Sequence, residues 1–446
     1  MSKKVVIIGG GASGLMAAIT AAHKGACVTL IEHKEKVGKK ILMTGNGKCN
    51  LTNMSDIHGK YYGDDIDRIY TVLDKFTADD TRTFFRQLGL YTREKRDGGV
   101  YPVTEQAASV LDVLKAECKH CDVQMLTDTE VLEVLPEKEG GMVLIETAIK
   151  EISSIVKTKK GNGSKKPAVK PVVVGTKKNK MHYDSLIIAA GGQAAAVSGS
   201  DGSGYRLAKK LGHSLIKPLP ALVQLKCEGD YFKLIAGVRA QAALSLYVDG
   251  ELQAKEEGEL QLTDYGISGI PVFQFSRIVS RVIYEQQVGL RHAEKDSVIV
   301  KIDFLTYMSQ NDMEELIKKR DCYAHKTVEE FLGGLVHKKL ASLICQMNNW
   351  NENTSVERLV DDELMEGLKQ LKNFMVIVVG TNSYDSAQVC CGGIPLTEIM
   401  DSMESIKCPH VYFTGEILDC DGICGGYNLQ WAWATGRIAG EHAAVK

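Results

Sequence analysis

The chain has 446 residues, of which 44% are hydrophobic and 25% are charged, and its formal net charge is −2. A chain of this length can bury a large core and is expected to form two or three domains. The near-neutral charge gives no electrostatic case for nucleic acid, and no run reaches the roughly 18 apolar residues that a membrane helix needs. Twelve cysteines without a secretion signal predict reduced thiols in the cytoplasm.

The N-terminal stretch has the residue order of a strand, a glycine-rich turn and a helix. Val5–Ile8 is a β-branched apolar run without polar alternation, as a strand buried on both faces requires. Gly9, Gly11 and Gly14 fit G-x-G-x-x-G, which combines a tight turn, a close approach to pyrophosphate and close helix–strand packing. The Ala-rich run from Leu15 to His23 predicts a helix whose N-terminus attracts phosphate.

Glu32 follows a second predicted buried strand, Cys27–Ile31. A carboxylate about 20 residues past the glycines can accept both hydrogens of a ribose diol. Its charge argues against a 2′-phosphate at this position, because the two charges would repel. Since all these parts occur in the required order, the stretch predicts a bound dinucleotide, either FAD or NAD.

The next elements are a polar loop and a group of helices. Residues 33–53 are rich in Gly, Asn, Thr and Lys, which is typical of a solvated loop, although the loop directly follows the ribose-binding acid. Residues 64–90 predict one or two helices, and Ala107–Lys119 predicts another, with strands expected over 123–126 and 129–135.

Two other motifs have competing interpretations. Cys118 and Cys121 form a C-x-x-C pair at the end of a predicted helix, where the dipole does not stabilise a thiolate, so we interpret the pair as structural. Residues 150–182 are lysine-rich, as in a nucleic-acid-binding tail. An isolated basic cluster in a neutral protein favours instead a hairpin with a lysine-solvated tip.

The C-terminal part returns to the nucleotide-binding pattern. Residues 183–192 predict a buried strand that ends in glycines, and residues 374–379 predict another strand. Val411–Phe413 then leads to a Gly-Glu pair at 415–416. The sequence Gly-Gly-Tyr-Asn at 425–428 opens a helix of small and aromatic residues, whose N-terminus favours negative charge.

The residues GKKILMTGNGKCNLTN at 38–53, the glycine fingerprint and the C-terminal segment resemble the BaiN-like or aminoacetone-oxidase-like bacterial flavoproteins. This family belongs to the glutathione-reductase-type FAD-binding superfamily. The resemblance implies bound FAD, with the 44–50 loop against it. The sequence departs from the family at Asp264, where a His is usual, and at Ala190, where the superfamily has Thr.

The resemblance extends the dinucleotide fingerprint to a full set of expected FAD contacts. It places the adenine near the backbone of the 129–135 strand and the flavin near the C-terminal helix. The expected cofactor-binding residues are Gly9, Gly11, Ala12, Ser13, Gly14, Glu32, His33, Lys39, Thr44, Gly45, Asn46, Lys48, Cys49, Asn50, Val131, Ala190, Gly191, Gly415, Glu416, Gly426, Asn428 and Leu429.

The expected fold class is α/β, with a Rossmann-like FAD-binding domain in three ββα layers, an inserted β-rich, barrel-like domain and a helical cap. The insertion is the usual place for substrate selection in such flavoproteins, but it contains no motif that identifies a substrate. The expected divisions are 1–200 with 373–446 for the FAD-binding domain, 201–275 with about 350–372 for the β-rich domain, and 276–350 for the cap.

Only one complete dinucleotide fingerprint is present, so NAD(P)H is expected to dock transiently as the reductant. Hydride would pass from the flavin to the β-carbon of an activated C=C bond, and a donor would protonate the α-carbon. Tyr427, beside the Gly-Gly turn, is the leading candidate donor, with Tyr265 and Arg239 as weaker candidates.

Four cysteines from two distant segments could also lie near the flavin. A flavin-coupled disulfide or a metal site is one interpretation, but adjacent cysteines and C-x-x-x-C lack the usual ligand spacing. The favoured interpretation is packing by small buried side chains. The four are Cys390, Cys391, Cys420 and Cys424.

Three functions follow from these patterns. The first is an NAD(P)H-dependent reductase of an enone, which the resemblance extends to steroid or bile-acid substrates. The second is an oxygen-dependent amine oxidase of the aminoacetone type, and the third is a non-catalytic flavoprotein scaffold, such as an RNA-associated one. The expected partner is a small-molecule substrate, without nucleic acid or membrane, and no metal is expected.

Overall fold

The computed structural model describes residues 2–151, 172–292, 297–351 and 353–445. The chain forms two compact units, and each is described by itself. The first unit comprises Met1–Pro218 and Cys391–Lys446, and the second comprises Leu219–Cys390.

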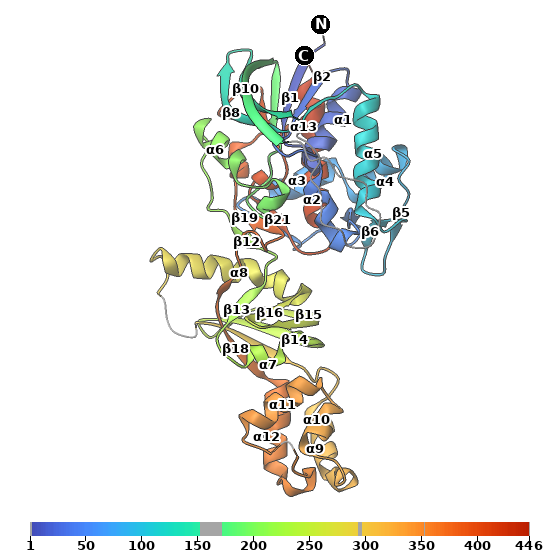
Figure 1. The fold of residues 1–446 in the computed structure, drawn as a ribbon, viewed down its shortest axis with the longest axis vertical. Coiled ribbons are helices and arrows are strands. Elements are labelled where there is room, and N and C mark those ends of the chain that lie inside the picture. Colours follow the sequence, from blue (N-terminus) through green and yellow to red (C-terminus); the bar gives the residue numbers. More distant parts are fainter. Residues whose placement is uncertain (1, 152–171, 293–296, 352, 446) are drawn as a thin grey trace. The chain divides into compact units, whose positions relative to one another are not determined.

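A parallel sheet forms the centre of the first unit, and Figure 1 labels two of its strands, β1 and β2. The strand order is β20-β11-β1-β2-β7 among the described residues. The strands pair in parallel at every step of this order. Val5, Ile7 and Leu186 are fully buried, which explains the continuous apolar runs that predicted these strands. The bounds are β1 Lys4–Ile8, β2 Cys27–Ile31, β7 Gln124–Leu126, β11 Ser185–Ile188 and β20 Val411–Phe413.

Helices and a second sheet form the other two layers of this unit, which confirms the expected ββα arrangement. The helices α1 Ala12–His23 and α13 Tyr427–Ala444 contact the parallel sheet and each other, and α5 Ala107–His120 packs against α1. An antiparallel sheet of β8 Thr129–Glu137, β9 Gly140–Glu151 and β10 Val172–Tyr183 also contacts the parallel sheet.

Glycines allow α13 to lie directly on the α1 backbone. A Cβ at Gly436 would lie 2.4 Å from the Ser13 carbonyl oxygen, and a Cβ at Gly440 would lie 2.6 Å from that of Ala17. The close approach buries Trp431 and Trp433 on α13. The small and aromatic residues predicted for this helix therefore form its contact with α1 and the core.

The lysine-rich stretch is a hairpin where it is described. β9 and β10 pair antiparallel from Gly141–Tyr183 to Glu151–Val172. Lys177, Lys178 and Lys180 are exposed on β10, as a solvated hairpin requires. The expected tip at 152–171 lies outside the described residues.

The region predicted as one or two helices at 64–90 forms two, α3 Ile66–Lys75 and α4 Ala78–Gln87. The break occurs because Thr77 caps α4 and its hydroxyl accepts the Asp80 N–H at 3.2 Å. The other elements of the first unit are α2 Lys39–Met43, β3 Thr52–Asn53, β4 Tyr61–Gly63, β5 Thr92–Glu94, β6 Gly99–Pro102, α6 Ser203–Lys210, β21 Cys420–Gly422, and the 3-10 helices Thr44–Gly47, Ala196–Ser198, Leu396–Glu398 and Gly415–Ile417.

The second unit is built on a closed barrel, with the order β13-β16-β15-β14-β17-β18 among the described residues. Its strands pair antiparallel, and the barrel confirms the expected β-rich, barrel-like insertion. A short sheet pairs β12 Leu219–Ala221 with β19 Val389–Cys391. The barrel strands are β13 Leu225–Cys227, β14 Arg239–Val248, β15 Glu251–Thr263, β16 Gly266–Gly269, β17 Val298–Asp303 and β18 Phe374–Thr381.

The position of β18 differs from the sequence expectation, which assigned residues from 373 onward to the FAD-binding domain. β18 pairs with β17 and β13 in the barrel instead. Phe374, Val376 and Val378 point into the barrel core, whereas Met375 and Val379 are more than half exposed. The apolar run therefore belongs to a strand with one buried face, although its outward residues are also apolar.

Helices share a hydrophobic core with the barrel in the second unit. The core includes Leu340 and Ile344 from the helical segment together with Val300 and Val376 from the barrel. Among the described residues, no helix is both long enough and apolar enough to cross a membrane. The helices are α7 Phe232–Ile235, α8 Ile270–Gln287, α9 Gln310–Lys318, α10 Val328–Gly333, α11 Lys338–Met347 and α12 Asp361–Lys372, with 3-10 turns at Arg320–Tyr323 and Val356–Arg358.

Candidate functional site

Three sequence-distant segments meet at the N-terminal end of α1. The Ser13 hydroxyl on α1 donates to the Thr414 carbonyl oxygen at 3.5 Å. The Gly415 N–H donates to the Thr435 hydroxyl on α13 at 2.9 Å. The Trp431 indole N–H of α13 also donates to the Gly415 carbonyl oxygen, at 3.2 Å. The tertiary structure therefore joins the two ends of the chain at the predicted dinucleotide turn.

The glycine fingerprint has different physical roles at its three positions. A Cβ at Gly9, where φ is 104°, would lie 2.3 Å from the Ala189 carbonyl oxygen. A Cβ at Gly14 would lie 1.9 Å from the Gly9 carbonyl oxygen, so both glycines are needed for packing. At Gly11, by contrast, a Cβ would meet nothing within 4 Å. Gly11 is the α1 N-cap and has no side chain to cap Ala12 and the first turn, so the N–H groups of this turn fit an anion such as a diphosphate.

Glu32 is fixed at the end of β2 by two backbone donors. Its Oε2 accepts the Gly10 N–H at 2.9 Å, and its Oε1 accepts the Lys34 N–H at 2.8 Å. The side chain of His33 lies beside it, with Nδ1 at 3.3 Å from Oε1. Within the described part of the chain, Nε2 of His33 is buried without a hydrogen-bond partner. That ring nitrogen lies 3.9 Å from Oδ2 of Asp201, beyond hydrogen-bond distance. The held carboxylate and the ring nitrogen without a hydrogen bond fit the ribose side of a dinucleotide.

The backbone near Glu32 brings the other expected AMP contacts together. The Thr129 N–H at the start of β8 donates to the Glu32 carbonyl oxygen at 3.0 Å, and Val131 follows on the same strand. Ala190 and Gly191 follow directly after β11, and Gly191 has a φ of 70°. These residues lie where the sequence analysis expected them, and their contact with FAD stays a prediction.

The lysine next to Glu416 is Lys40, whereas the predicted cofactor contact is its neighbour Lys39. The Lys40 Nζ lies 2.5 Å from Oε2 of Glu416 and donates to the Ala194 carbonyl oxygen at 3.2 Å. Lys39, which was selected, lies with its Nζ 3.8 Å from Oε1 of Glu35. Neighbouring side chains on a helix point about 100° apart, so a choice between adjacent lysines of α2 needs the tertiary structure.

The loop between α2 and β3 has an unusual backbone and an exposed face. Gly45 and Asn46 both have a φ of 54°, and Cys49 has a φ of 57°. Gly45–Lys48 are exposed and Thr44 is half-buried, whereas Cys49 and Asn50 are buried. Burial raises the pKa of the Cys49 thiol to about 11, so it is neutral at pH 7. Within the described ranges, Oδ1 of Asn50 is buried without a hydrogen-bond partner, as a residue awaiting a ligand would be.

A cationic cluster next to this loop was not predicted. Glu105, with a φ of 49°, lies among three cations. These interactions hold the pKa of Glu105 well below its usual range, at about 2. Because one carboxylate neutralises only one of the three cations, the cluster has two positive charges in excess. The three cations are Lys48 at 3.2 Å, Lys95 at 3.5 Å and Arg93 in a hydrogen bond.

The cationic cluster is tied to the loop through an aromatic ring. The Lys95 Nζ lies 4.0 Å from the centre of the Tyr101 ring. A Cβ at Gly45 would lie 3.7 Å from the same ring. The members come from positions 48 to 105, so no sequence spacing predicts the cluster.

The start of α13 is fixed by Gly426, Tyr427 and Asn428. Gly426 has a φ of 99°, and its added Cβ would lie 2.7 Å from the Thr52 carbonyl oxygen. The Asn428 side chain accepts the Gly422 N–H at 2.9 Å and donates to the Gly422 carbonyl oxygen at 2.7 Å. Asn428 therefore holds the turn before the helix, and Leu429 is half-buried behind it.

Tyr427, the leading candidate proton donor, is 4% exposed. Its ring packs edge-to-face on Tyr61, with centroids 5.6 Å apart. Burial raises the pKa of Tyr427, so its hydroxyl keeps its proton at neutral pH. The weaker candidates lie in the second unit: the Tyr265 hydroxyl accepts from Asn382 at 3.0 Å, and Arg239 pairs with Glu259 at 3.3 Å.

The four candidate cysteines differ in exposure. Cys390, Cys391 and Cys420 are buried and Cys424 is half-buried. The burial of three of the four side chains fits the packing interpretation, which stays a prediction.

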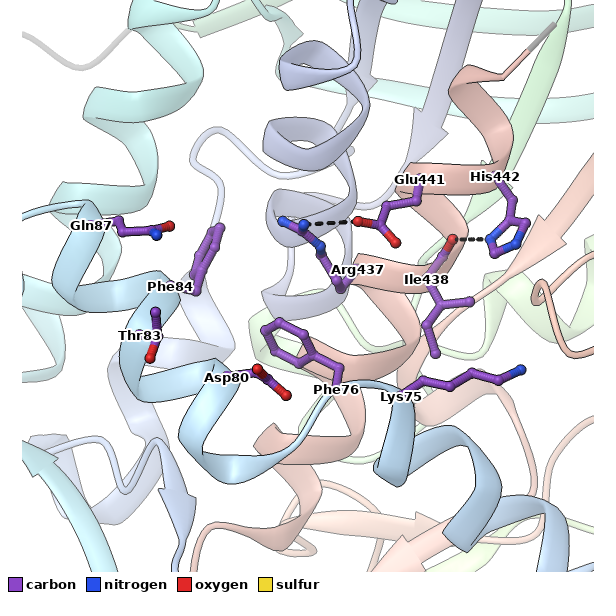
Figure 2. Close-up of a pocket in the computed structure, with 10 residues that line it drawn as sticks. All are labelled: Lys75, Phe76, Asp80, Thr83, Phe84, Gln87, Arg437, Ile438, Glu441 and His442. Atoms are coloured by element: carbon purple, nitrogen blue, oxygen red, sulfur yellow. Dashed lines mark hydrogen bonds and ion pairs between the residues drawn. The ribbon is translucent and has the colours of Figure 1, made fainter.

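A surface pocket of about 420 Å³ lies along the second half of α13 and is separate from this site. Figure 2 shows the Phe76 and Phe84 rings on one side and the Arg437–Glu441 ion pair on the other. Arg437 is ten residues from Tyr427, or roughly 15 Å along the helix. The pocket is lined by Lys75, Phe76, Asp80, Thr83, Phe84, Gln87, Arg437, Ile438, Glu441 and His442.

The family model described as "HI0933-like protein Rossmann domain" matches residues 3–442. The chain belongs to this family. The BaiN-like resemblance and the FAD-binding fold that it implied are therefore confirmed, and FAD is the cofactor that the fold binds.

Relatives of the family cover nearly the whole chain. A Clostridium scindens protein named 3-dehydro-bile acid delta(4,6)-reductase is 39% identical over 99% of both chains. A Haemophilus influenzae protein named ribosomal RNA dihydrouridine synthase is 27% identical over 96% of both chains. Among solved structures, the open conformation of a flavocytochrome c3 fumarate reductase matches at 14% identity with a TM-score of 0.46, covering 99% of this chain and 78% of that chain.

Proposed function

We propose that this family member is an FAD-dependent oxidoreductase that uses NAD(P)H to reduce a C=C bond conjugated to a carbonyl group, with a steroid or bile-acid enone as its substrate. The observation that carries the proposal is the 39% identity, over 99% of both chains, to a relative named as a bile-acid reductase. The site described above supports it, because its residues fit FAD.

The bond class has support beyond that one relative. A 3-dehydro bile acid carries a ketone at C3, to which its Δ4 and Δ6 double bonds are conjugated. Synthesis of dihydrouridine reduces the C5=C6 bond of uracil, which is conjugated to the C4 carbonyl. The two reactions named for these relatives therefore both saturate a C=C bond next to a carbonyl.

The chain's own residues have defined tasks in such a reaction. Bound FAD supplies the hydride chemistry. The α1 N-terminus holds the diphosphate at Gly11, and the Glu32 carboxylate holds the ribose. Tyr427, a buried tyrosine whose phenol is neutral at pH 7, holds the proton for the α-carbon of the substrate.

The cationic cluster around Glu105 supports transient docking of the reductant. NAD(P)H carries a diphosphate, and the cluster has two positive charges in excess beside the exposed residues Gly45–Lys48. Guanidinium and ammonium groups are the usual partners of phosphate. We therefore assign Lys48, Arg93 and Lys95 to the docking of this diphosphate.

A second candidate function is reduction of uridine in RNA. Relatives from Haemophilus influenzae and Escherichia coli, at 27% and 26% identity, carry the name ribosomal RNA dihydrouridine synthase. The exposed lysines of β10 favour this candidate, because ammonium groups attract the phosphates of RNA. The support is limited, since the net charge of the chain is −2. The prediction that the protein binds no nucleic acid therefore needs a direct test with RNA.

The experiment is anaerobic bleaching of the flavin absorbance, first with NADH and NADPH separately. The reduced protein is then mixed with a 3-keto-Δ4 steroid, with a uridine-containing ribosomal RNA fragment, or with oxygen. We expect bleaching by one dinucleotide and fast recolouring by the steroid.

Recolouring by RNA alone would favour the second candidate. Bleaching by aminoacetone, with recolouring only by oxygen, would identify an amine oxidase. The proposal fails if neither dinucleotide bleaches the flavin faster than background.

A further inference from the structure

Three metal-ligating side chains meet at the C-terminal end of α1, opposite the dinucleotide turn. His23 is the last residue of α1, and Glu117 and Cys121 lie at the end of α5. Nε2 of His23 lies 2.7 Å from Oε1 of Glu117, and the Cys121 thiol donates to the same oxygen at 3.5 Å. The three ligand atoms all lie within 4.8 Å of one another.

The spacing on α5 explains why these two side chains share a face. Residues i and i+4 of a helix lie one above the other, so Glu117 and Cys121 both point toward α1. Cys118 lies with Leu114 and Leu111 on the buried face and is fully buried. The C-x-x-C pair is thus divided, because one cysteine belongs to the core and the other to the cluster.

The electrostatic environment of the cluster favours a cation. Both α1 and α5 end there, and each helix C-terminus carries a partial negative charge. The Glu117 carboxylate adds a full negative charge and is only 21% exposed. Asp122, next to Cys121, adds another carboxylate.

We propose that His23, Glu117 and Cys121 form a binding site for a divalent cation of the zinc class, with water as the fourth ligand. Imidazole nitrogen, carboxylate oxygen and thiolate sulfur are all zinc ligands, whereas Mg²⁺ and Ca²⁺ prefer oxygen alone. Binding releases the Cys121 thiol proton to solvent.

One pair of ligand atoms already has the separation that zinc requires, and a second pair has to open. Tetrahedral zinc with ordinary bond lengths separates its N and O ligands by roughly 3.4 Å and its S and O ligands by roughly 3.6 Å. The Cys121–Glu117 distance of 3.5 Å already matches. The His23–Glu117 distance of 2.7 Å has to open, and the His23 side chain, which is 43% exposed at a helix end, is free to rotate.

The site is distinct from the proposed flavin chemistry. α1 extends for 12 residues from Ala12 to His23. The cluster therefore lies roughly 18 Å along the helix from the diphosphate-binding end. A cation there would join α1 to α5 and stabilise their packing, and the inference does not depend on the substrate or the reductant.

The test is anaerobic titration of the chelator-treated flavoprotein with Co²⁺, read as a difference spectrum against the same sample without cobalt. We expect one cobalt per chain with a sulfur-to-cobalt charge-transfer band, and Zn²⁺ should displace it. Cys121→Ser should abolish the band and weaken zinc binding by at least about tenfold. Cys322→Ser, at an exposed cysteine of the second unit, is the matched control and should leave both unchanged.

Flavin absorbance reports whether each variant has folded. If Cys121→Ser loses its flavin, His23→Gln decides the question, and it should weaken zinc binding by a similar factor. The proposal is overturned if the wild-type protein binds no stoichiometric cobalt or zinc, or if the charge-transfer band persists in Cys121→Ser.

Discussion

The contact between α1 and α13 offers a direct test of how the two ends of the chain build the cofactor site. Gly436→Ala would place a Cβ 2.4 Å from the Ser13 carbonyl oxygen and 3.1 Å from Cβ of Met16. Both neighbours belong to a buried helix and cannot rotate away. The two helices must therefore separate by several tenths of an ångström.

The expected loss of stability combines two opposing effects. Overpacking a tight core costs about 1–3 kcal/mol, and contact with backbone belongs at the upper end. Replacing glycine by alanine inside a helix also stabilises the helix by up to about 1 kcal/mol, which offsets part of this cost. The net cost is about 2 kcal/mol, which lowers Tm by roughly 4–8 °C for a unit of this size. Because Ser13 is in the first turn of α1, the shift also displaces the phosphate-binding end and reduces bound FAD.

Thermal unfolding and the ratio of flavin to protein absorbance measure both effects. Gly333→Ala is the matched control, since this glycine is also helical and its added Cβ meets nothing within 4 Å. The control should have unchanged FAD content and equal or higher Tm. A Gly436→Ala protein with wild-type Tm and full FAD would refute the reasoning.

Three further predictions concern side chains of the site. Lys40→Met should lower FAD retention about tenfold, because it removes the charge-assisted hydrogen bond that holds Glu416, an expected FAD contact. Lys39→Met should change FAD retention little, since Lys39 pairs with Glu35 instead. Flavin release on dilution measures both. The pKa of Glu105 is lowered to about 2, so its contribution to stability is present above its unfolded pKa and is lost as the pH falls from about 4.5 toward 2. Urea unfolding of Glu105→Gln should therefore show a weaker dependence on pH in that window, and an identical dependence would contradict the assignment. Tyr427→Phe should slow enone reduction by about 100-fold or more while leaving flavin bleaching by the dinucleotide unchanged, and stopped-flow absorbance separates the two steps.

Local patterns in the sequence were sufficient for the first unit's central elements. A strand buried on both faces must be continuously apolar, so the apolar run Val5–Ile8 was enough to predict β1. A turn that approaches phosphate must be free of side chains, so the glycines of Gly9–Gly14 were enough to predict the turn before α1. The same holds for Glu32 at the end of β2. Family resemblance added the C-terminal Gly415–Glu416 turn and the helix after it, and with them FAD as the cofactor.

Tertiary structure decided which side chains meet. Lys40 rather than Lys39 reaches Glu416 because a helix turns adjacent residues apart. The strand predicted at 374–379 exists as β18, but it pairs within the barrel rather than in the FAD-binding domain. The Glu105 cluster and the His23–Glu117–Cys121 cluster join residues from different elements, up to 98 positions apart for His23 and Cys121, and no spacing rule connects such elements. Sequence periodicity records which face of an element is buried, whereas the partner across that face depends on the fold of the whole unit.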